Sequence, residues 1–182
     1  MGELAANGAA SIGYRNAGTM EFLFDQDGSF YFMEMNTRIQ VEHPVTEEVT
    51  GIDLVKEQIL VAAGEPMSLT QDDVEAGTAT RSSAASTPRT SSTTSGPAPA
   101  RSRTGTSPAV PGCASTATCT RATRSRRYYD SMIGKLIAHG KDRAEALRRM
   151  EIALEEMIVE GIKTTIPFHR LALASEKFRR VT

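Results

Sequence analysis

Residues 19–36 read TMEFLFDQDGSFYFMEMN, with two runs rich in aromatic residues on either side of Asp27-Gly28. Aspartate followed by glycine is a strong signal for a tight hairpin turn, and aromatic residues favour strands. Folding the segment about this dipeptide places Glu21 opposite Glu34, although a longer loop would shift that register. Because directly opposed carboxylates repel each other, the pattern predicts a cation that neutralises the pair.

Polar residues continue at every second position beyond Glu34, through Asn36, Arg38, Gln40 and Glu42, and share its face if the chain stays extended. Carboxylate and amide oxygens suit Mg²⁺ or Mn²⁺, arginine offers a planar fork of donors to a small oxyanion, and a neighbouring carboxylate can act as a base. A solvated polar strand face explains the same spacing equally well. The candidate metal ligands are Glu21, Glu34 and Asn36.

Bulk composition excludes several classes of protein. The chain has 182 residues, 40% of them hydrophobic, and a formal net charge of -1, which gives no electrostatic reason to expect a nucleic-acid or anionic-membrane partner. Apolar runs such as residues 59–63 are far shorter than the roughly 18 residues of a membrane-spanning helix, and no basic and apolar leader follows Met1. A cytoplasmic protein is therefore expected.

The chain divides into three zones, at residues 1–76, 77–127 and 128–182. The first contains a helical pattern from Leu54 that Gly64 can cap, and the last contains one that begins after Asp142 as N-cap and includes Ile158. In the middle zone every residue is Ala, Gly, Pro, Arg, Ser or Thr, except Val110, Cys113 and Cys119. Such a stretch is typical of a disordered linker, because it has little apolar surface to offset the chain entropy lost on folding.

Residues 34–47 read EMNTRIQVEHPVTE and resemble the catalytic signature of biotin carboxylases, which belong to the ATP-grasp superfamily. The similarity extends to residues 52–58, 128–136 and 161–165. It implies an α+β fold, in which residues 1–76 form the carboxyl-terminal part of an ATP-grasp catalytic domain with antiparallel strands and helices. Residues 128–182 would be what remains of a disrupted biotin carboxylase C-terminal domain.

The resemblance also implies roles for the metal candidates. Glu21 and Glu34 would bind the Mg²⁺ or Mn²⁺ ions that bridge ATP phosphates, and Asn36 would complete the second site. The amino-terminal domain, glycine-rich lid and nucleotide-binding lysines of the family have no counterpart in this sequence. The expected product is therefore a fragment of an acyl-CoA carboxylase system, such as the acetyl-CoA carboxylase of fatty acid biosynthesis, that is inactive alone.

A bicarbonate site follows from the same resemblance. Arg38 would hold bicarbonate with backbone help from Gln40 and Val41, and Glu42 would deprotonate it for attack on the γ-phosphate of ATP. The carboxyphosphate formed would deliver CO₂ to the ureido nitrogen of biotin on a carrier protein or domain. The intact family usually forms homodimers.

The middle zone yields family-like sequence when it is read in a shifted frame. If each codon takes the last base of one codon and the first two of the next, residues 77–90 permit RHGHAIECRINAED, residues 95–103 permit FRPSPGKIT and residues 112–123 permit GVRVDSHLYEGY. We infer a one-base loss near residues 75–77 and a one-base gain near Arg127. The family arginine that stabilises the biotin enolate would be lost between Cys113 and Ala114, and several strands of the C-terminal domain would be missing.

Two alternatives remain open. A non-catalytic module would use a flexible basic arm, from Arg81 to Arg127, to engage an acidic partner. Another ATP-grasp ligase, such as carbamoyl-phosphate synthetase, shares part of the pattern, although the His43-Pro44 pair and residues 128–135 favour biotin carboxylase. Pyruvate, propionyl-CoA and methylcrotonyl-CoA carboxylases carry the same motif.

Overall fold

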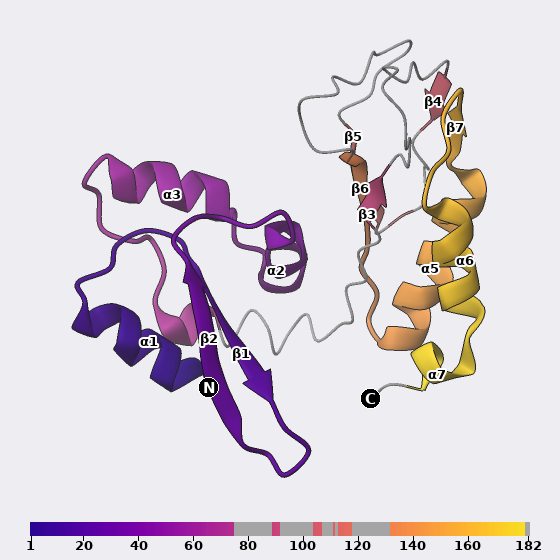
Figure 1. Cartoon of the computed structure of the whole chain (residues 1–182). Coiled ribbons are helices and arrows are strands. Elements are labelled where there is room, and N and C mark those ends of the chain that lie inside the picture. The colour runs from indigo at the N-terminus through magenta and orange to yellow at the C-terminus, as the bar shows by residue number, and fades with distance from the viewer. Residues whose placement is uncertain (75–88, 92–103, 107–110, 112, 118–131, 181–182) are drawn as a thin grey trace, which may run out of the picture. The chain divides into compact units, whose positions relative to one another are not determined.

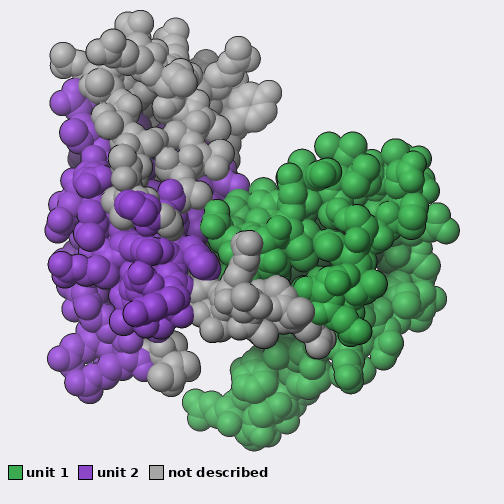
Figure 2. All heavy atoms as spheres, turned by 180° about the vertical axis from the view of Figure 1, so that it is seen from behind, with its two compact units in different colours: residues 1–77 green, residues 78–182 purple. Residues whose placement is uncertain are grey.

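The computed structural model describes residues 1–74, 89–91, 104–106, 111, 113–117 and 132–180 (Figure 1). The chain forms two compact units, residues 1–77 and 78–182, which Figure 2 shows in separate colours. Most of the three shifted-frame runs, most of the basic arm and residues 128–131 lie outside the described residues, so the frameshift and the arm remain predictions.

The described part of the first unit contains helices and one hairpin, and residues 71–74 are also helical. Its elements are α1 (Gly2–Ser11), β1 (Thr19–Phe24), β2 (Phe30–Asn36), α2 (His43–Thr50) and α3 (Leu54–Ala62). β1 and β2 form a two-stranded antiparallel sheet, which confirms the predicted hairpin. Phe22 makes edge-to-face contacts with Phe30 and Phe32, at centroid distances of 5.7 and 5.9 Å.

The hairpin reaches the predicted pairing by an unexpected route. Phe24 pairs with Phe30, so the loop is longer than two residues and the register near the turn is shifted by one from the tight-turn prediction. A bulge then shifts the register back between Glu21 and Phe22, and Glu21 pairs with Glu34 as predicted. The extra residue in the bulge is Met33.

The loop is held by its own polar groups. The Asp25 N–H donates to the Ser29 carbonyl at 2.8 Å, and the Asp27 carboxylate accepts the Ser29 N–H at 2.8 Å. This hydrogen bond to the charged form lowers the pKa of the Asp27 carboxyl. Gly28 has a φ of 87°, which residues with a Cβ rarely adopt, so glycine is favoured at this position.

The polar segment after the hairpin does not stay extended, and the prediction of one shared face through Glu42 is wrong. β2 ends at Asn36, and Glu42 is the N-cap of α2 with αR dihedral angles of φ -84° and ψ -3°. Pro44 lies in the first turn of α2, where its fixed φ favours a helix and its missing N–H leaves no donor unsatisfied. The chain therefore turns at the residues that the two-residue period assigned to a strand.

Helix α3 matches its prediction at both ends. The Asp53 carboxylate accepts the Lys56 N–H at 2.8 Å and caps the first turn. The helix ends at Ala62, and Gly64 follows with a φ of 90°. Gly51, with a φ of 77°, ends α2 in the same left-handed region.

The second unit packs helices against a three-stranded sheet. Its strands are β3 (Arg89–Ser91), β4 (Thr104–Thr106), β5 (Cys113–Ala117), β6 (Met132–Ala138) and β7 (Ile158–Glu160), and its helices are α5 (Arg143–Glu156), α6 (Ile166–Ala174) and α7 (Glu176–Arg179). β6 lies between β3 and β5, antiparallel to both, while β4 pairs with β7. The core contains Leu136, Ala138, Leu147, Met150, Ala153, Leu154 and Leu173.

Strands form inside the low-complexity zone, so the prediction that they are missing is wrong for β3, β4 and β5. Ladder hydrogen bonds join backbone groups, and the threonines of these segments are compatible with a pleated strand. Cys113 also packs against the core cluster. Its Sγ lies 3.8 Å from the Arg149 carbonyl.

The helix predicted after Asp142 is confirmed at its start and wrong at its end. The Asp142 carboxylate accepts the Glu145 N–H at 2.8 Å, as expected of an N-cap. α5 ends at Glu156, and Ile158 belongs to β7 instead. Pairing of Ile158 with Thr106, a contact 52 positions away in the chain, overrides the helical spacing of the sequence.

Burial differs sharply between the units. No described residue of the first unit is buried, whereas β6 and α5 of the second contain most of the buried side chains. Among the described residues, no helix is long and apolar enough to cross a membrane.

Candidate functional site

The two opposed glutamates of the hairpin are joined by an amide. The Asn36 Nδ2 donates to Glu21 Oε1 at 2.8 Å and to Glu34 Oε1 at 3.2 Å. Antiparallel pairing brings Glu21 and Glu34 together, and Asn36 reaches them from the last residue of β2. The N–H groups of this amide partly offset the charge of two carboxylates that would otherwise repel each other.

The loop after β2 turns back onto the same cluster. The Gln40 Nε2 donates to Glu21 Oε1 at 3.2 Å, so this oxygen accepts from two amides. Arg38 Nη2 lies 3.5 Å from the Asn36 Oδ1, and its Nη1 donates to the Ile39 carbonyl at 3.2 Å. Sequence spacing alone therefore identified residues that contact one another, although the chain between them is not a strand.

Glu42, the predicted base, lies apart from this hydrogen-bonded cluster. Its side chain is exposed and accepts no hydrogen bond from the described residues, while its carbonyl accepts the Val45 N–H at 2.9 Å. An unpaired, hydrated carboxylate is able to accept a proton from a ligand that approaches it. Its place at the start of α2 follows from the turn that precedes the helix.

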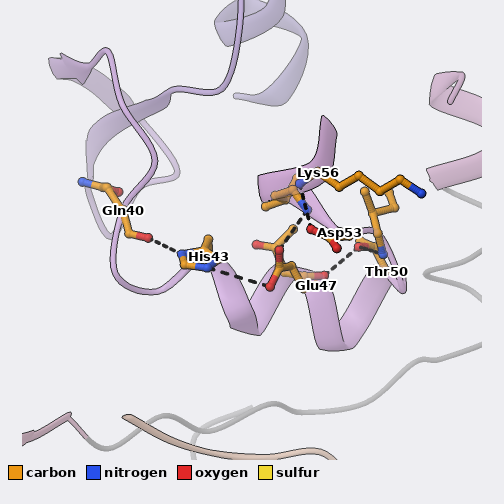
Figure 3. Close-up of polar contacts among 9 residues, drawn as sticks. Gln40, His43, Glu47, Thr50, Asp53 and Lys56 are labelled. Atoms are coloured by element: carbon orange, nitrogen blue, oxygen red, sulfur yellow. Dashed lines mark hydrogen bonds and ion pairs between the residues drawn. The ribbon is translucent and has the colours of Figure 1, made fainter. Parts of the chain in front are cut away.

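His43, for which no role in the site was predicted, contacts Gln40, one of the residues predicted to bind bicarbonate. His43 Nδ1 lies 2.7 Å from the Gln40 carbonyl oxygen, and its Nε2 lies 3.9 Å from Glu47 Oε2 (Figure 3). Glu47 Oε1 in turn accepts the Leu54 N–H at 2.8 Å. The four-residue spacing of His43 and Glu47 could have predicted this contact, because side chains four positions apart lie on the same face of a helix.

The donor set fits a hard divalent cation. Within the residues that the structure describes, no group of three or more His, Cys, Asp or Glu side chains could hold a metal ion. The hairpin places two carboxylates together, and Asn36 faces them with its amide Nδ2, so its oxygen becomes a ligand only after the amide turns over. Mg²⁺ commonly takes one or two carboxylates from the protein and completes its shell with water and phosphate oxygens. Glu21, Glu34 and Asn36 match that requirement in number and type.

A separate cavity of about 580 Å³ lies elsewhere in the first unit. It is lined by residues 15–17, by one face of α3 and by residues 64–67. None of the predicted site residues contributes to it, so it is distinct from the glutamate cluster.

Two family models match the chain in succession. A model for the "Carbamoyl-phosphate synthase L chain, ATP binding domain" matches residues 1–70, and one for the "Biotin carboxylase C-terminal domain" matches residues 93–182. The second match begins inside the low-complexity zone and continues to residue 182. It favours biotin carboxylase over carbamoyl-phosphate synthetase.

Individual relatives agree with these models. The chain is 47% identical over 182 residues to biotin carboxylase of Haemophilus influenzae, covering 99% of this chain and 40% of that relative. It is 48% identical over 181 residues to biotin carboxylase 1 of Bacillus subtilis, covering 98% and 40%. The chain thus spans about two fifths of the length of these curated relatives.

A solved structure has the same fold. The biotin carboxylase domain dimer of Hydrogenobacter thermophilus 2-oxoglutarate carboxylase, in complex with MgADP, ADP and bicarbonate, superposes with a TM-score of 0.87 at 37% identity. The match covers 98% of this chain and 39% of that one. An α+β architecture, with an ATP-grasp segment followed by a biotin carboxylase C-terminal domain, is thereby confirmed, and the chain belongs to the biotin carboxylase family.

Proposed function

We propose that the chain serves the first half-reaction of a biotin-dependent carboxylase, the ATP-dependent carboxylation of biotin by bicarbonate. The observation that carries this proposal is the pairing of Glu21 with Glu34, bridged by Asn36 and joined by Gln40. Two opposed carboxylates without a cationic side chain between them provide a site for a divalent ion beside nucleotide phosphates. Because the relatives are longer than this chain, the remaining ATP-binding groups belong to parts that it does not include.

The metal-binding residues are Glu21, Glu34 and Asn36. Mg²⁺ or Mn²⁺ held there would supply electrostatic stabilisation of the charge that develops on the transferred phosphoryl group. Asn36 holds the two carboxylates close together through its amide N–H groups, and its Oδ1 lies on the side of Arg38. This arrangement links the metal ligands to the anion-binding residues.

Arg38, Gln40 and Val41 would bind bicarbonate. A planar guanidinium matches the geometry of a carboxylate-like anion, and backbone N–H groups add donors without flexible side chains. Glu42 would take the bicarbonate proton, so that the anion attacks the γ-phosphate of ATP, releases ADP and forms carboxyphosphate. Carboxyphosphate then divides into phosphate and CO₂, the phosphate accepts the ureido proton of biotin, and CO₂ bonds to that nitrogen.

The partners follow from the proposed reaction. Biotin would arrive on a carrier protein or domain, and a cytoplasmic homodimer is the proposed assembly. The dimer of the biotin carboxylase domain of the Hydrogenobacter enzyme supports the proposed homodimer.

Divalent metal binding by the full chain tests the site. Mn²⁺ is added to the protein, and the concentration of free Mn²⁺ is measured by electron paramagnetic resonance. We expect Glu21→Gln and Glu34→Gln each to weaken Mn²⁺ binding by more than about tenfold. Glu3→Gln is the matched control, because this substitution on α1 removes the same charge elsewhere in the unit. Equal Mn²⁺ affinity in all four proteins would exclude the hairpin as the metal site.

Turnover tests the reaction. We expect the chain alone to release no phosphate from ATP. When the missing parts of a longer relative are joined to it, phosphate release should require both bicarbonate and free biotin, and Arg38→Ala or Glu42→Gln should abolish that dependence. If the joined protein binds Mn²⁺ through the two glutamates and yet releases no phosphate, the metal site stands and the proposed reaction is excluded.

A further inference from the structure

The carbonyl of Gln40 accepts two hydrogen bonds from a single residue. The His43 backbone N–H donates to it at 3.2 Å, and the His43 ring Nδ1 lies 2.7 Å from the same oxygen (Figure 3). A carbonyl oxygen only accepts hydrogen bonds, so Nδ1 must carry the hydrogen. The side chain thus selects one arrangement of the imidazole and one orientation of the Gln40 carbonyl.

The opposite edge of the ring faces Glu47, which contacts the next helix, α3. The His43 Nε2 lies 3.9 Å from Glu47 Oε2, one turn further along α2, and the other oxygen of that carboxylate accepts the first backbone N–H of α3, from Leu54. Both side chains are largely shielded, at 20% and 25% exposed. The imidazole is therefore held between the loop before α2 and the start of α3.

Fixing the Gln40 carbonyl also fixes the next N–H. Among the described residues no peptide bond is cis, and in a trans peptide the carbonyl of one residue and the N–H of the next point in opposite directions. The Val41 N–H therefore points away from the oxygen that His43 holds. The side chain of Gln40 meanwhile donates to Glu21, so the same residue connects the held peptide with the metal ligands.

We propose that His43 is a positioning residue for bicarbonate, acting through the Gln40–Val41 peptide. The proposal rests on the proposed function, since it takes bicarbonate as the anion at this loop. His43 neither contacts the anion nor transfers a proton. Its Nδ1–H keeps the peptide in the orientation that the Val41 N–H needs to donate, so that the donor is arranged before the anion arrives.

Three substitutions separate this role from a general contribution to stability. His43→Asn keeps a donor at the position of Nδ1, because the asparagine Nδ2 is the same number of bonds from the backbone. His43→Gln keeps a donor at the more distant position of Nε2, and His43→Leu removes both. If His43 only stabilised the start of α2, glutamine, the better helix former, would be tolerated at least as well as asparagine.

Nuclear magnetic resonance on the full chain gives two readouts. Long-range ¹H–¹⁵N spectra report which ring nitrogen carries the hydrogen, and the Val41 amide resonance reports the orientation of its peptide. We expect hydrogen on Nδ1, a Val41 resonance that is preserved in His43→Asn, and one that is displaced in His43→Gln and His43→Leu. Hydrogen on Nε2 alone, or an unmoved Val41 resonance in His43→Leu, would overturn the proposal.

Titration with ¹³C-labelled bicarbonate then measures the consequence. We expect affinity in His43→Asn close to that of the unaltered chain, and about tenfold weaker affinity in His43→Gln and His43→Leu. Equal affinity in all four proteins would overturn the positioning role. If the unaltered chain binds no bicarbonate, the proposed function fails and the positioning of bicarbonate fails with it, while the ring and amide spectra still decide whether His43 holds the peptide.

Discussion

Glu21 and Glu34 lie opposite each other because two irregularities of the hairpin compensate. The loop is longer than a two-residue turn, which shifts the strands by one position, and the bulge at Met33 shifts them back. Either change alone would place Glu21 opposite a different residue, since one-residue shifts of register exchange the faces of a strand. The opposition of two carboxylates was predictable from the sequence, but the route to it was not, because bulges have no reliable signal in a single sequence.

Cys113 is a second residue whose environment is set by packing. It comes from the low-complexity zone and packs against the core, and burial is the main cause that raises the pKa of its thiol above the ordinary value of 9.0. The folded chain therefore keeps the thiol proton to higher pH than the unfolded chain does. The stability linked to this proton is fully present below the unfolded pKa and is lost as pH rises through the folded pKa.

Alkylation of Cys113 tests this environment. In a Cys119→Ser chain, which leaves one thiol, we expect iodoacetamide to react more slowly with the folded than with the urea-unfolded protein at pH 8.5, because the thiolate is the reactive form. The rate should rise at a higher pH when the chain is folded. Equal rates in the two states would show that Cys113 is not packed against the core.

At the scale of elements, α5 was predicted from its N-cap candidate Asp142, and α3 from its apolar spacing and the glycine that follows it. α3 begins after Asp53 and α5 after Asp142, and both aspartates accept a backbone N–H three residues ahead. The end of α5 and the whole of α2 were missed. α2 is only eight residues long, and β7 exists because it pairs with β4, a partner more than fifty positions earlier.

Removing the cap of α5 should destabilise the second unit. We expect Asp142→Ala to lower its free energy of unfolding by about 1 kcal/mol, because the Glu145 N–H loses its acceptor. Asp142→Asn keeps an acceptor oxygen and should lie within a few tenths of a kcal/mol of the unaltered chain. Urea unfolding, followed by circular dichroism, measures the differences, and equal losses in both variants would mean that charge rather than capping matters there.

At the scale of the whole molecule, the site and the core lie in different units. Every predicted ligand belongs to the first unit, which has no buried residue among those described, while the second unit holds the packed core. Apolar side chains on both strands of the hairpin are exposed, among them Leu23, Phe24, Tyr31 and Phe32. Burial of apolar surface is the main favourable term in folding, so the first unit is expected to be the less stable.

Hydrogen exchange should reveal this difference directly. We expect amides of β1 and β2 to exchange about 100-fold faster than those of β6 and α5, because local opening of the first unit needs no disruption of a core. Mn²⁺ should slow exchange at the hairpin and leave α5 unchanged. Equal protection in both units would contradict the expected order of stability.

The frameshift inferred for residues 77–127 can be tested only in the gene, because the protein sequence does not record the bases. The family model for the C-terminal domain matches the chain as written from residue 93, so it does not test the reading frame of this zone. We expect resequencing from the codon of Asp73 to that of Asp130 to restore one base near Gly77 and remove one near Arg127. An unchanged sequence would mean that the zone is translated as written, in a damaged gene or as a genuine insert.

Local chemistry carried the predictions that the sequence alone could make. The Asp27-Gly28 turn, the Asp142 cap, the apolar spacing before Gly64 and the run from Glu34 to Glu47 all depend on neighbouring residues, so they identified the hairpin, two helices and the family. Tertiary structure decided what depends on distant partners. Strands in the low-complexity zone form by pairing with β6 and β7, and the His43 ring joins the Gln40 carbonyl to the start of α3, because backbone pairing and side-chain packing follow proximity in space.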